Sequence, residues 1–498
     1  MSRRTITLSS RSRGSVARGP RALVAGAVAA AVTLGALTGT TAQAEQAALP
    51  AGSPLQLWAP AAAVAYTYDG YLYEGVGLRL VAPTEAFELW SNRPSYDDPI
   101  HTEWRGSGGT VALPEGTMTD FTGLPDFLKL TIRRASDNSF VRKVTLSGCL
   151  NGESVRMRPD ADARSPYPWG CPNNPYTLGS VMGIQAGWST SFGADWRNPI
   201  KLKAGDYQVR AKINPVYASA FGISAEDAQR TFGLKVIAEG DVKAAAPANP
   251  RPAAHEPTAK SAGAVVGPVP DLRALPAFGI VLNRDGTALR FGANVWNGGE
   301  SPLVVDGFRG ADEDAMDAYQ YFFDADGNQT GYQLVGQMHF HSGNHNHWHF
   351  EDFAQYRLLN ADLTEAVKST KQSFCLANTD AVDYTVPGAD WRPDSTDLST
   401  ACGGREALSI REVLSSGSGD TYFQYRYGQA FRIRDLPNGV YYIAVEANPL
   451  GNLVESDTTN NTSLRKIRLG GKPGERRVTV FPVGIIDESQ WGGFYRHR

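Results

Sequence analysis

Apolar and polar residues alternate along two stretches in the first half of the chain. Leu128 to Ile132 alternates, and so does Tyr207 to Ala211, directly after a turn at Gly205-Asp206. A strand places successive side chains on opposite faces, so this period of two predicts strands with one buried face. Residues 45–239 follow this pattern of strands and turns, and a second region of the same kind spans residues 269–470. The sequence therefore predicts a mainly β fold.

The segment between these two regions has a different composition. Residues 240–268 are rich in Ala and Pro, which predicts a semi-extended linker with nothing to bury. A chain of 498 residues is also too long for one ordinary hydrophobic core. We expect two β-sandwich-like domains (45–239 and 269–470), this linker, and a tail (471–498) whose Val478–Pro482 stretch forms one more strand or a docking segment.

The two β-rich regions share short motifs at equal spacing. Asp126-Phe127 precedes Cys149 by the same interval that separates Asp352-Phe353 from Cys375, and residues 205–215 parallel residues 439–449. This predicts a repeated sandwich-like unit, although independent strand–turn–strand patterning is the alternative. The first copy has Thr145 and Trp188 where the second has Lys371 and Tyr422. We therefore expect residues 45–239 to be a degenerate copy without an active site.

Residues 1–44 have the features of a secretory signal peptide. Arg residues precede an apolar run from Ala22 to about Leu37, and Ala42-Gln43-Ala44 supplies a cleavage site of small residues. The run is short for a membrane span, so a retained anchor is the weaker alternative, and Arg3-Arg4 leaves twin-arginine export open. We expect a secreted protein with no membrane span after cleavage. Its four cysteines, one pair in each half, predict two disulfides, Cys149–Cys171 and Cys375–Cys402.

The net charge of the protein limits the kinds of ligand that it is suited to bind. The segment 1–44 holds six Arg and no acidic residue, so its removal takes the formal net charge from −3 to −9. An acidic protein is a poor match for nucleic acid or anionic lipid, and it is compatible with cationic amines.

Histidine is concentrated in one segment. Five of the eight His lie between His339 and His349. On a strand, His345, His347 and His349 share a face, and neutral imidazoles suit copper, zinc, iron or nickel. The outer two Cα atoms of a regular strand would lie roughly 13 Å apart, so the segment must bend for all three to bind one ion. The alternative is a His-rich surface loop.

Several short motifs now occur in a recognisable order. They are His345-Asn-His-Trp-His349, Glu351 to Leu359, Lys371-Gln-Ser-Phe-Cys375, Asp420-Thr-Tyr422, Gln429, Gly439-Val-Tyr441, Asn448-Pro449 and Glu455 to Asn461, with Pro270-Asp-Leu272 and Leu289-Arg-Phe291 upstream. In this order they resemble the lysyl oxidase family. The resemblance covers about residues 269–470 and does not extend to the first region.

The resemblance implies a chemistry for individual residues. His345, His347 and His349 would bind copper(II), while His339 and His341 would matter less. Lys371 and Tyr422 would form the self-derived cofactor lysine tyrosylquinone. The protein would then be a secreted amine oxidase that uses O₂ to convert primary amines, such as peptidyl lysine, to aldehydes with release of H₂O₂ and ammonia. The family's His in one motif is Gln355 here, so the general base remains open.

The same resemblance implies a second metal, calcium. Its ligands would be hard oxygens, which calcium prefers: Asp271, the Leu272 carbonyl, Glu455, Asp457, Asn460 and Asn461. Clusters of Asp, Asn and Thr also form turns without any metal, which is the alternative.

Two other functions compete with the oxidase. A non-catalytic extracellular copper-binding protein would need the His cluster but neither Lys371 nor Tyr422. A zinc hydrolase would need a motif such as His-Glu-x-x-His, which the sequence lacks. The natural amine, the oligomeric state and the role of the first region stay open.

Overall fold

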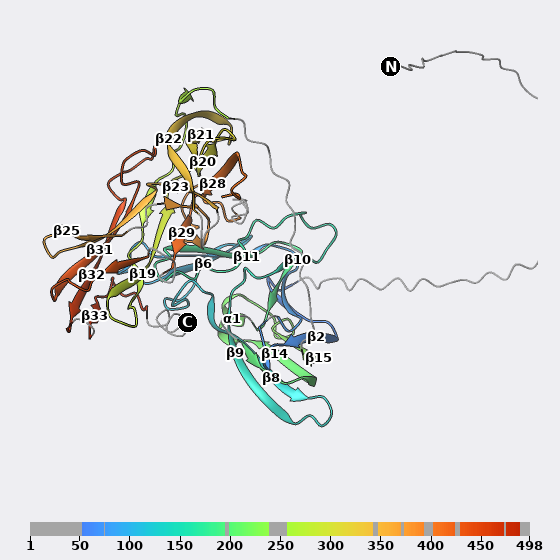
Figure 1. Cartoon of the computed structure of the whole chain (residues 1–498). Helices are drawn as coiled ribbons and strands as arrows, with labels where there is room; N and C mark the ends of the chain where they lie inside the picture. Colours follow the sequence, from blue (N-terminus) through green and yellow to red (C-terminus); the bar gives the residue numbers. More distant parts are fainter. Residues whose placement is uncertain are drawn as a thin grey trace, which may run out of the picture. The chain divides into compact units, whose positions relative to one another are not determined.

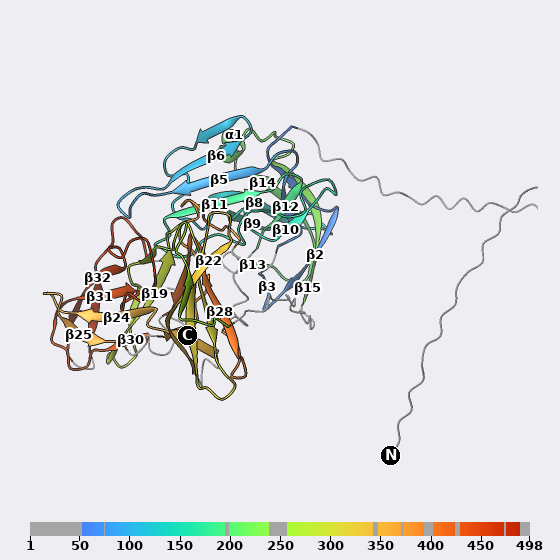
Figure 2. The ribbon, with the colours of Figure 1, turned by 90° about the horizontal axis from the view of Figure 1, so that it is seen from above.

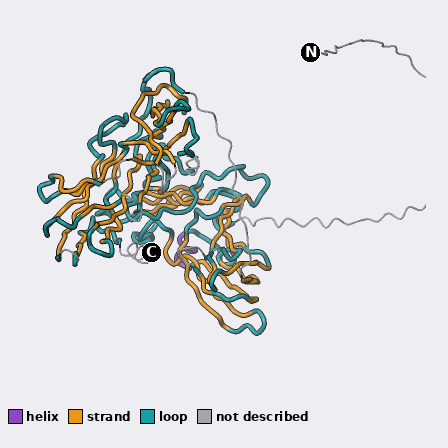
Figure 3. The backbone as a smooth tube through the Cα atoms, in the orientation of Figure 1, coloured by secondary structure: helices purple, strands orange, loops and turns teal. Residues whose placement is uncertain are grey.

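A computed structural model describes residues 52–73, 75–194, 199–238, 256–341, 347–369, 373–392, 402–423, 429–472 and 475–488. Strands dominate these residues, and the only helix among them is α1 (Pro215–Ala220) (Figure 3). The predicted mainly β fold is therefore confirmed. No helix in the described ranges is long and apolar enough to cross a membrane. The predicted signal peptide, residues 1–44, lies outside the described residues.

Strands of the first region form sheets of their own, and Gly179 at the start of β11 also bridges to Asp383 of the second region. One sheet has the order β1 (Gln56–Trp58), β4 (Leu78–Ala82), β12 (Trp188–Phe192), β10 (Ser154–Arg156). A second has the order β11 (Gly179–Ile184), β5 (Phe87–Asn92), β6 (His101–Gly106), β7 (Gly109–Ala112). A five-stranded sheet has the order β2 (Ala62–Thr67), β15 (Gln229–Ala238), β14 (Gly205–Ile213), β8 (Leu124–Arg134), β9 (Phe140–Gly148), and β13 (Ile200–Lys201) pairs with β3 (Tyr71–Leu72). Figure 1 and Figure 2 show these strands in blue to green.

Strands of the second region form three further sheets. The first contains β26 (Ser373–Phe374), β23 (His347–Glu351), β22 (Gln329–His341), β21 (Ala315–Phe323), β20 (Leu303–Phe308) and β28 (Ser409–Leu414), with β16 (Ser261–Gly263) beside β22. The second contains β17 (Leu272–Ala274), β19 (Ala288–Asn297), β29 (Ser418–Tyr422) and β27 (Asp380–Ala381), with β18 (Phe278–Leu282) and β30 (Ala430–Arg432) beside β19. The third has the order β25 (Glu365–Lys368), β24 (Ala354–Leu359), β31 (Gly439–Ala447), β32 (Thr462–Gly470), β33 (Arg477–Val480).

The two five-stranded sheets repeat one topology. The order β9-β8-β14-β15 in the first region matches β25-β24-β31-β32 in the second. Asp126 and Asp352, one in each motif, both have positive φ (51° and 58°). Each is followed by a Phe whose carbonyl accepts a hydrogen bond from an Asn backbone N–H, at 2.8 Å for Asn214 and 2.7 Å for Asn448. These matches support the predicted repeated unit.

The fifth strand distinguishes the two sheets. It is β2, parallel to β15, in the first region and β33, antiparallel to β32, in the second. The sequence expectation of one more strand in the tail is thereby met by Arg477–Val480.

Each of the two regions has its own main hydrophobic core. One contains buried apolar residues from Leu55 to Val236 only, and the other from Leu272 to Leu469. A smaller cluster joins the regions, because Tyr176 packs with Phe278 and Trp296. Contacts group residues 49–498 into one compact unit. The division into two domains stays a prediction. Residues 239–255, which include most of the predicted linker, lie outside the described residues. Near the end of the predicted linker, β16 pairs with β22.

Candidate active site

Two adjacent strands bring the described histidines of the cluster together. β22 and β23 pair antiparallel, with His341 opposite His347 and His339 opposite His349 (Figure 1). Directly opposite residues share a face, so all four imidazoles lie on one side of this hairpin. The alternate residues Phe340 and Trp348 pack edge to face on the other side, which fixes the register.

Three of these imidazoles touch. The His341 and His349 rings stack with centroids 4.4 Å apart, and the His347 ring lies 4.7 Å from His349. His349 is buried, whereas His339 is half-buried and lies 3.7 Å from the Glu351 carboxylate. His345, the third predicted ligand, lies outside the described residues. The sequence interpretation gave His341 a lesser role, yet the structure puts it within the cluster.

Ser373 connects this cluster to the next strand. β26 pairs with β23, and the Ser373 hydroxyl lies 3.0 Å from His341 Nε2 and 3.3 Å from His349 Nδ1. The hydroxyl can donate to one ring and accept from the other, so it can fix the ring orientations.

Tyr422 lies against the residues that follow Ser373. Its ring packs edge to face on Phe374 with centroids 4.9 Å apart. The Tyr422 hydroxyl donates to the Cys375 carbonyl at 3.1 Å and lies 3.2 Å from the Cys375 backbone N–H, which donates to it. Residues 373–375 therefore touch both the imidazoles and the predicted cofactor precursor. Lys371, the second precursor, lies outside the described residues.

The hydroxyl end of Tyr422 is enclosed among acidic groups. Burial raises the pKa of Tyr422 well above its usual value, and the charges of Asp420 and Glu412 add to the effect. Asp420 is two residues from Tyr422 on β29 and is buried, so the two side chains share a face. The phenol of Tyr422 is therefore neutral at physiological pH.

Glu412 is a buried carboxyl beside this pair. Burial raises its pKa well above the ordinary value, and the charge of Asp420 raises it further. The Leu376 backbone N–H donates to Glu412 at 3.0 Å. Glu412 is therefore harder to ionise than an exposed carboxyl group.

A disulfide fixes the segment that carries these contacts. Cys375 is bonded to Cys402, and Cys149 to Cys171, so both predicted disulfides are confirmed. The Trp348 backbone N–H donates to the Cys402 carbonyl at 2.8 Å. The disulfide thus links the residue that holds Tyr422 to the strand that carries His347 and His349.

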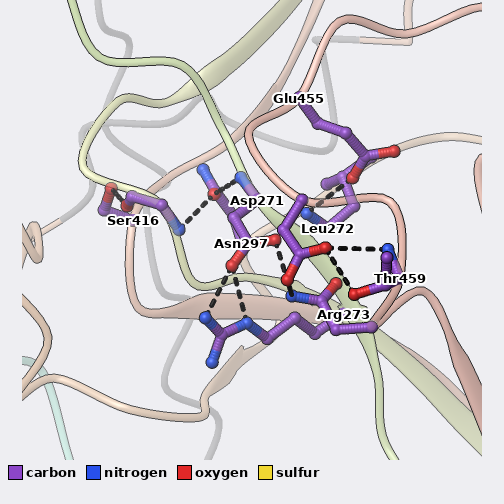
Figure 4. A network of polar contacts seen from close by, with 10 residues as sticks. Asp271, Leu272, Arg273, Asn297, Ser416, Glu455 and Thr459 are labelled. Atoms are coloured by element: carbon purple, nitrogen blue, oxygen red, sulfur yellow. Dashed lines mark hydrogen bonds and ion pairs between the residues drawn. The ribbon is translucent and has the colours of Figure 1, made fainter.

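The residues expected to bind calcium take part in a network of polar contacts, in which Figure 4 labels Asp271, Leu272 and Glu455. The Glu455 carboxylate accepts from the Leu272 backbone N–H at 2.9 Å and from the Asn461 amide at 2.8 Å. The Asn460 amide donates to Asp271 at 2.9 Å and to Asp457 at 3.3 Å. The side-chain oxygens of Asn460 and Asn461 are buried and accept no hydrogen bond from the described residues. Arg273 pairs with Asp271 at 2.6 Å, so one carboxylate oxygen is already engaged.

The donor set fits copper by its chemistry. Adjacent imidazoles in a half-buried setting are ligands of the kind that copper and zinc take. Among the described residues, however, no three His, Cys, Asp or Glu side chains are arranged to hold a metal ion. A complete ligand set therefore needs rearrangement of these rings or a donor such as His345.

Other residues weighed as bases have different surroundings. The Gln355 amide donates to Glu446 at 2.8 Å, and Arg357 forms an ion pair with the same carboxylate at 2.8 Å. Asp352 is only half-buried and occupies the positive-φ position before β24.

Sequence reasoning missed Ser373 and Glu412. Ser373 lay within a quoted motif, whereas nothing in the sequence around Glu412 marks it.

Comparison with known proteins supplies one match. A family model described as lysyl oxidase matches residues 331–478. The matched stretch runs from within β22 to β33, and it contains the imidazole cluster, Ser373, Cys375, Glu412, Asp420 and Tyr422. No curated protein matches the chain.

Proposed function

We propose that this chain, whose residues 331–478 match the lysyl oxidase family model, is a secreted, copper-dependent amine oxidase with a lysine tyrosylquinone cofactor. The net reaction would consume a primary amine, O₂ and water, and release an aldehyde, ammonia and H₂O₂. Peptidyl lysine and free alkylamines are the substrate class.

The observation that carries this proposal is the position of residues 373–375. Ser373 contacts two imidazoles, Phe374 packs on the Tyr422 ring, and Cys375 hydrogen-bonds the Tyr422 hydroxyl. In sequence, Lys371 precedes Ser373 by two residues, and two residues of chain span at most about 7 Å. A cross-link between Lys371 and Tyr422 beside the imidazoles is therefore sterically reasonable. A simple copper carrier has no need for the Tyr422 contacts.

We assign copper to His345, His347 and His349, with His341 as a further donor or ring partner. When bound, copper with O₂ would supply the oxidising power that converts the Tyr422 ring to a quinone joined to Lys371. The protein's part is placement. Phe374 and the Cys375 backbone hold the ring, and Ser373 orients His341 and His349.

Asp420 is the proton acceptor we propose for amine oxidation. It is buried and shares a strand face with Tyr422, and its charge acts on Tyr422 and on Glu412. Burial disfavours the ionised form of a carboxyl group, so a buried carboxylate is a stronger base than an exposed one.

Charge also fits an amine substrate. Residues 269–470 contain 26 Asp and Glu against 16 Lys and Arg. An acidic surface raises the local concentration of cationic ligands and speeds their association.

We further propose that the network around Asp271 and Glu455 binds calcium. The buried side-chain oxygens of Asn460 and Asn461 support this, because buried carbonyl oxygens without a donor are suited to a hard cation. A calcium-dependent rise in melting temperature that is lost in Glu455→Gln tests the assignment.

The decisive experiment on function is peptide mapping of copper-loaded protein for a Lys371–Tyr422 cross-link, compared with Tyr422→Phe. The substitution removes one hydroxyl and its contacts with Cys375, so the fold and copper content should persist. Quinone absorbance and amine oxidation should be lost. A Tyr422→Phe protein that still oxidised amines would refute the proposal, and a copper-loaded native protein without the cross-link would favour the copper-binding alternative.

A further inference from the structure

The five-stranded sheet of the first region has one buried and one open face. Leu128, Leu130 and Ile132 on β8, and Val209 and Ala211 on β14, all face the first core. The register places the alternate residues together on the opposite side. That open side of β9, β8, β14 and β15 is called the outer face here; Figure 1 shows the strands side by side.

The outer face is strongly basic. Its exposed cations are Lys129, Arg133, Lys143, Arg210, Lys212 and Lys235, against one acid, Asp206, which lies opposite Lys235. Residues 45–239 as a whole contain 18 Lys and Arg and 20 Asp and Glu. A third of the Lys and Arg residues of the region thus lie on this one face with a single acid. The excess of positive charge is confined to this face, because the region as a whole is slightly acidic.

The register arranges these charges in rows across the strands. One row runs Thr145, Lys129, Lys212, Gln229, and the next runs Lys143, Thr131, Arg210, Thr231. Neighbouring strands lie about 5 Å apart and alternate residues about 7 Å apart. Among the described residues none of the six cations forms an ion pair within the chain. The result is a shallow grid of cations separated by hydroxyl and amide groups.

The residues that separate the cations indicate which kind of anionic partner the outer face would bind. Within the two rows the residues between the cations are Thr and Gln, which hydrogen-bond hydrated anions. The rows themselves contain no aromatic ring for base stacking, which single-stranded nucleic acid binding uses. Exposed apolar side chains lie outside the rows, with Phe140 opposite Arg133 on β8 and Val64 opposite Lys235 on β15.

From these features we propose that the outer face binds an extended, flexible polyanion that carries a phosphate or sulfate on each repeat. The first region then attaches the enzyme to an anionic matrix. The acidic second region remains available to cationic amines, so the two regions bind ligands of opposite charge. This inference does not depend on the oxidase chemistry.

The test uses the full chain with two probes, long-chain inorganic polyphosphate and heparin, over a range of salt concentrations. The test variant carries Lys129→Gln, Lys143→Gln, Arg210→Gln and Lys212→Gln. The matched control removes four exposed cations from the second region: Arg432→Gln, Arg434→Gln, Lys466→Gln and Arg468→Gln. Retained disulfides and melting temperature show that each variant is folded.

The native chain and the control should bind at least one probe, and the test variant should bind it at least tenfold more weakly. The slope of log K against log salt should fall by about 3 in the test variant, because four charge contacts are lost. The probe that binds more tightly identifies phosphate or sulfate as the preferred group. Equal weakening in both variants would overturn the proposal. Vesicles containing phosphatidylglycerol serve as a further probe, and binding to these vesicles but to neither polymer would also overturn it. Oxidation of a small diamine should be unchanged in the test variant.

Discussion

Tyr422 shares its surroundings with two buried carboxyl groups, Asp420 and Glu412. Burial raises the pKa of Tyr422 and of Glu412, and Asp420 adds to both effects. At the scale of single residues, the two acids differ in their contacts. Asp420 shares a strand face with Tyr422, whereas Glu412 accepts a hydrogen bond from the Leu376 backbone N–H at 3.0 Å.

The two acids can be separated by amide substitution. Asp420→Asn removes the proposed proton acceptor, and general-base catalysis contributes about 10²–10⁴-fold, so kcat should fall by at least about 100-fold. Glu412→Gln keeps the shape of a side chain that we do not assign to proton transfer, so kcat should fall less than tenfold. Steady-state kinetics on a small amine checks both. Copper and quinone content must persist in each variant, since their loss would indicate a structural role for Asp420.

Strand pairing, rather than sequence proximity, assembles the imidazole cluster. His341 and His347 are six positions apart, yet the β22–β23 register makes them direct partners, and Ser373 joins from β26. The same register puts His339 on this face, but the imidazole of His339 lies 3.7 Å from the Glu351 carboxylate. Strand pairing therefore determines which histidines, although they look equivalent in the sequence, lie close enough to bind one ion.

Replacement of His341 tests this role of the hairpin. His341→Ala removes a ring that stacks on His349 and a contact with Ser373, so copper content should fall at least tenfold at limiting copper. His339→Ala removes a ring that faces Glu351 and should change copper content less than twofold. Metal analysis after dialysis against a copper buffer measures both. Equal losses would mean that the cluster around His349 is not the metal site.

How far the sequence predicted these elements depends on the type of signal. Alternation in residues 128–132 and 207–211 predicted strands correctly, because it reports directly on one buried face. Repeat spacing led to both disulfides and to the shared topology of the two sheets. The role of His341 was missed because register is a tertiary property, and Glu412 was missed because no local pattern marks a buried acid.

The whole molecule is held together by contacts that no single region contains. Tyr176 belongs to the first region, Arg465 to β32 of the second, and Glu488 to the tail. The Tyr176 hydroxyl donates to Glu488 at 2.5 Å, Arg465 pairs with the same carboxylate at 2.5 Å, and Arg465 also donates to the Tyr176 hydroxyl. Tyr176 and Arg465 are buried, so this network lies in the interior and its charges are weakly screened.

Glu488→Gln tests whether this network couples the regions. The change leaves the Arg465 guanidinium buried without its counter-charge, which should lower the free energy of unfolding by about 3 kcal/mol. The control Glu475→Gln removes an exposed acid from the same tail and should have little effect. Because Arg465 loses its counter-charge where the regions meet, we expect calorimetry to resolve two transitions in Glu488→Gln where the native chain shows one. A single transition at the native temperature would mean that the tail does not couple the two regions and that the apolar cluster around Phe278 and Trp296 is sufficient to do so.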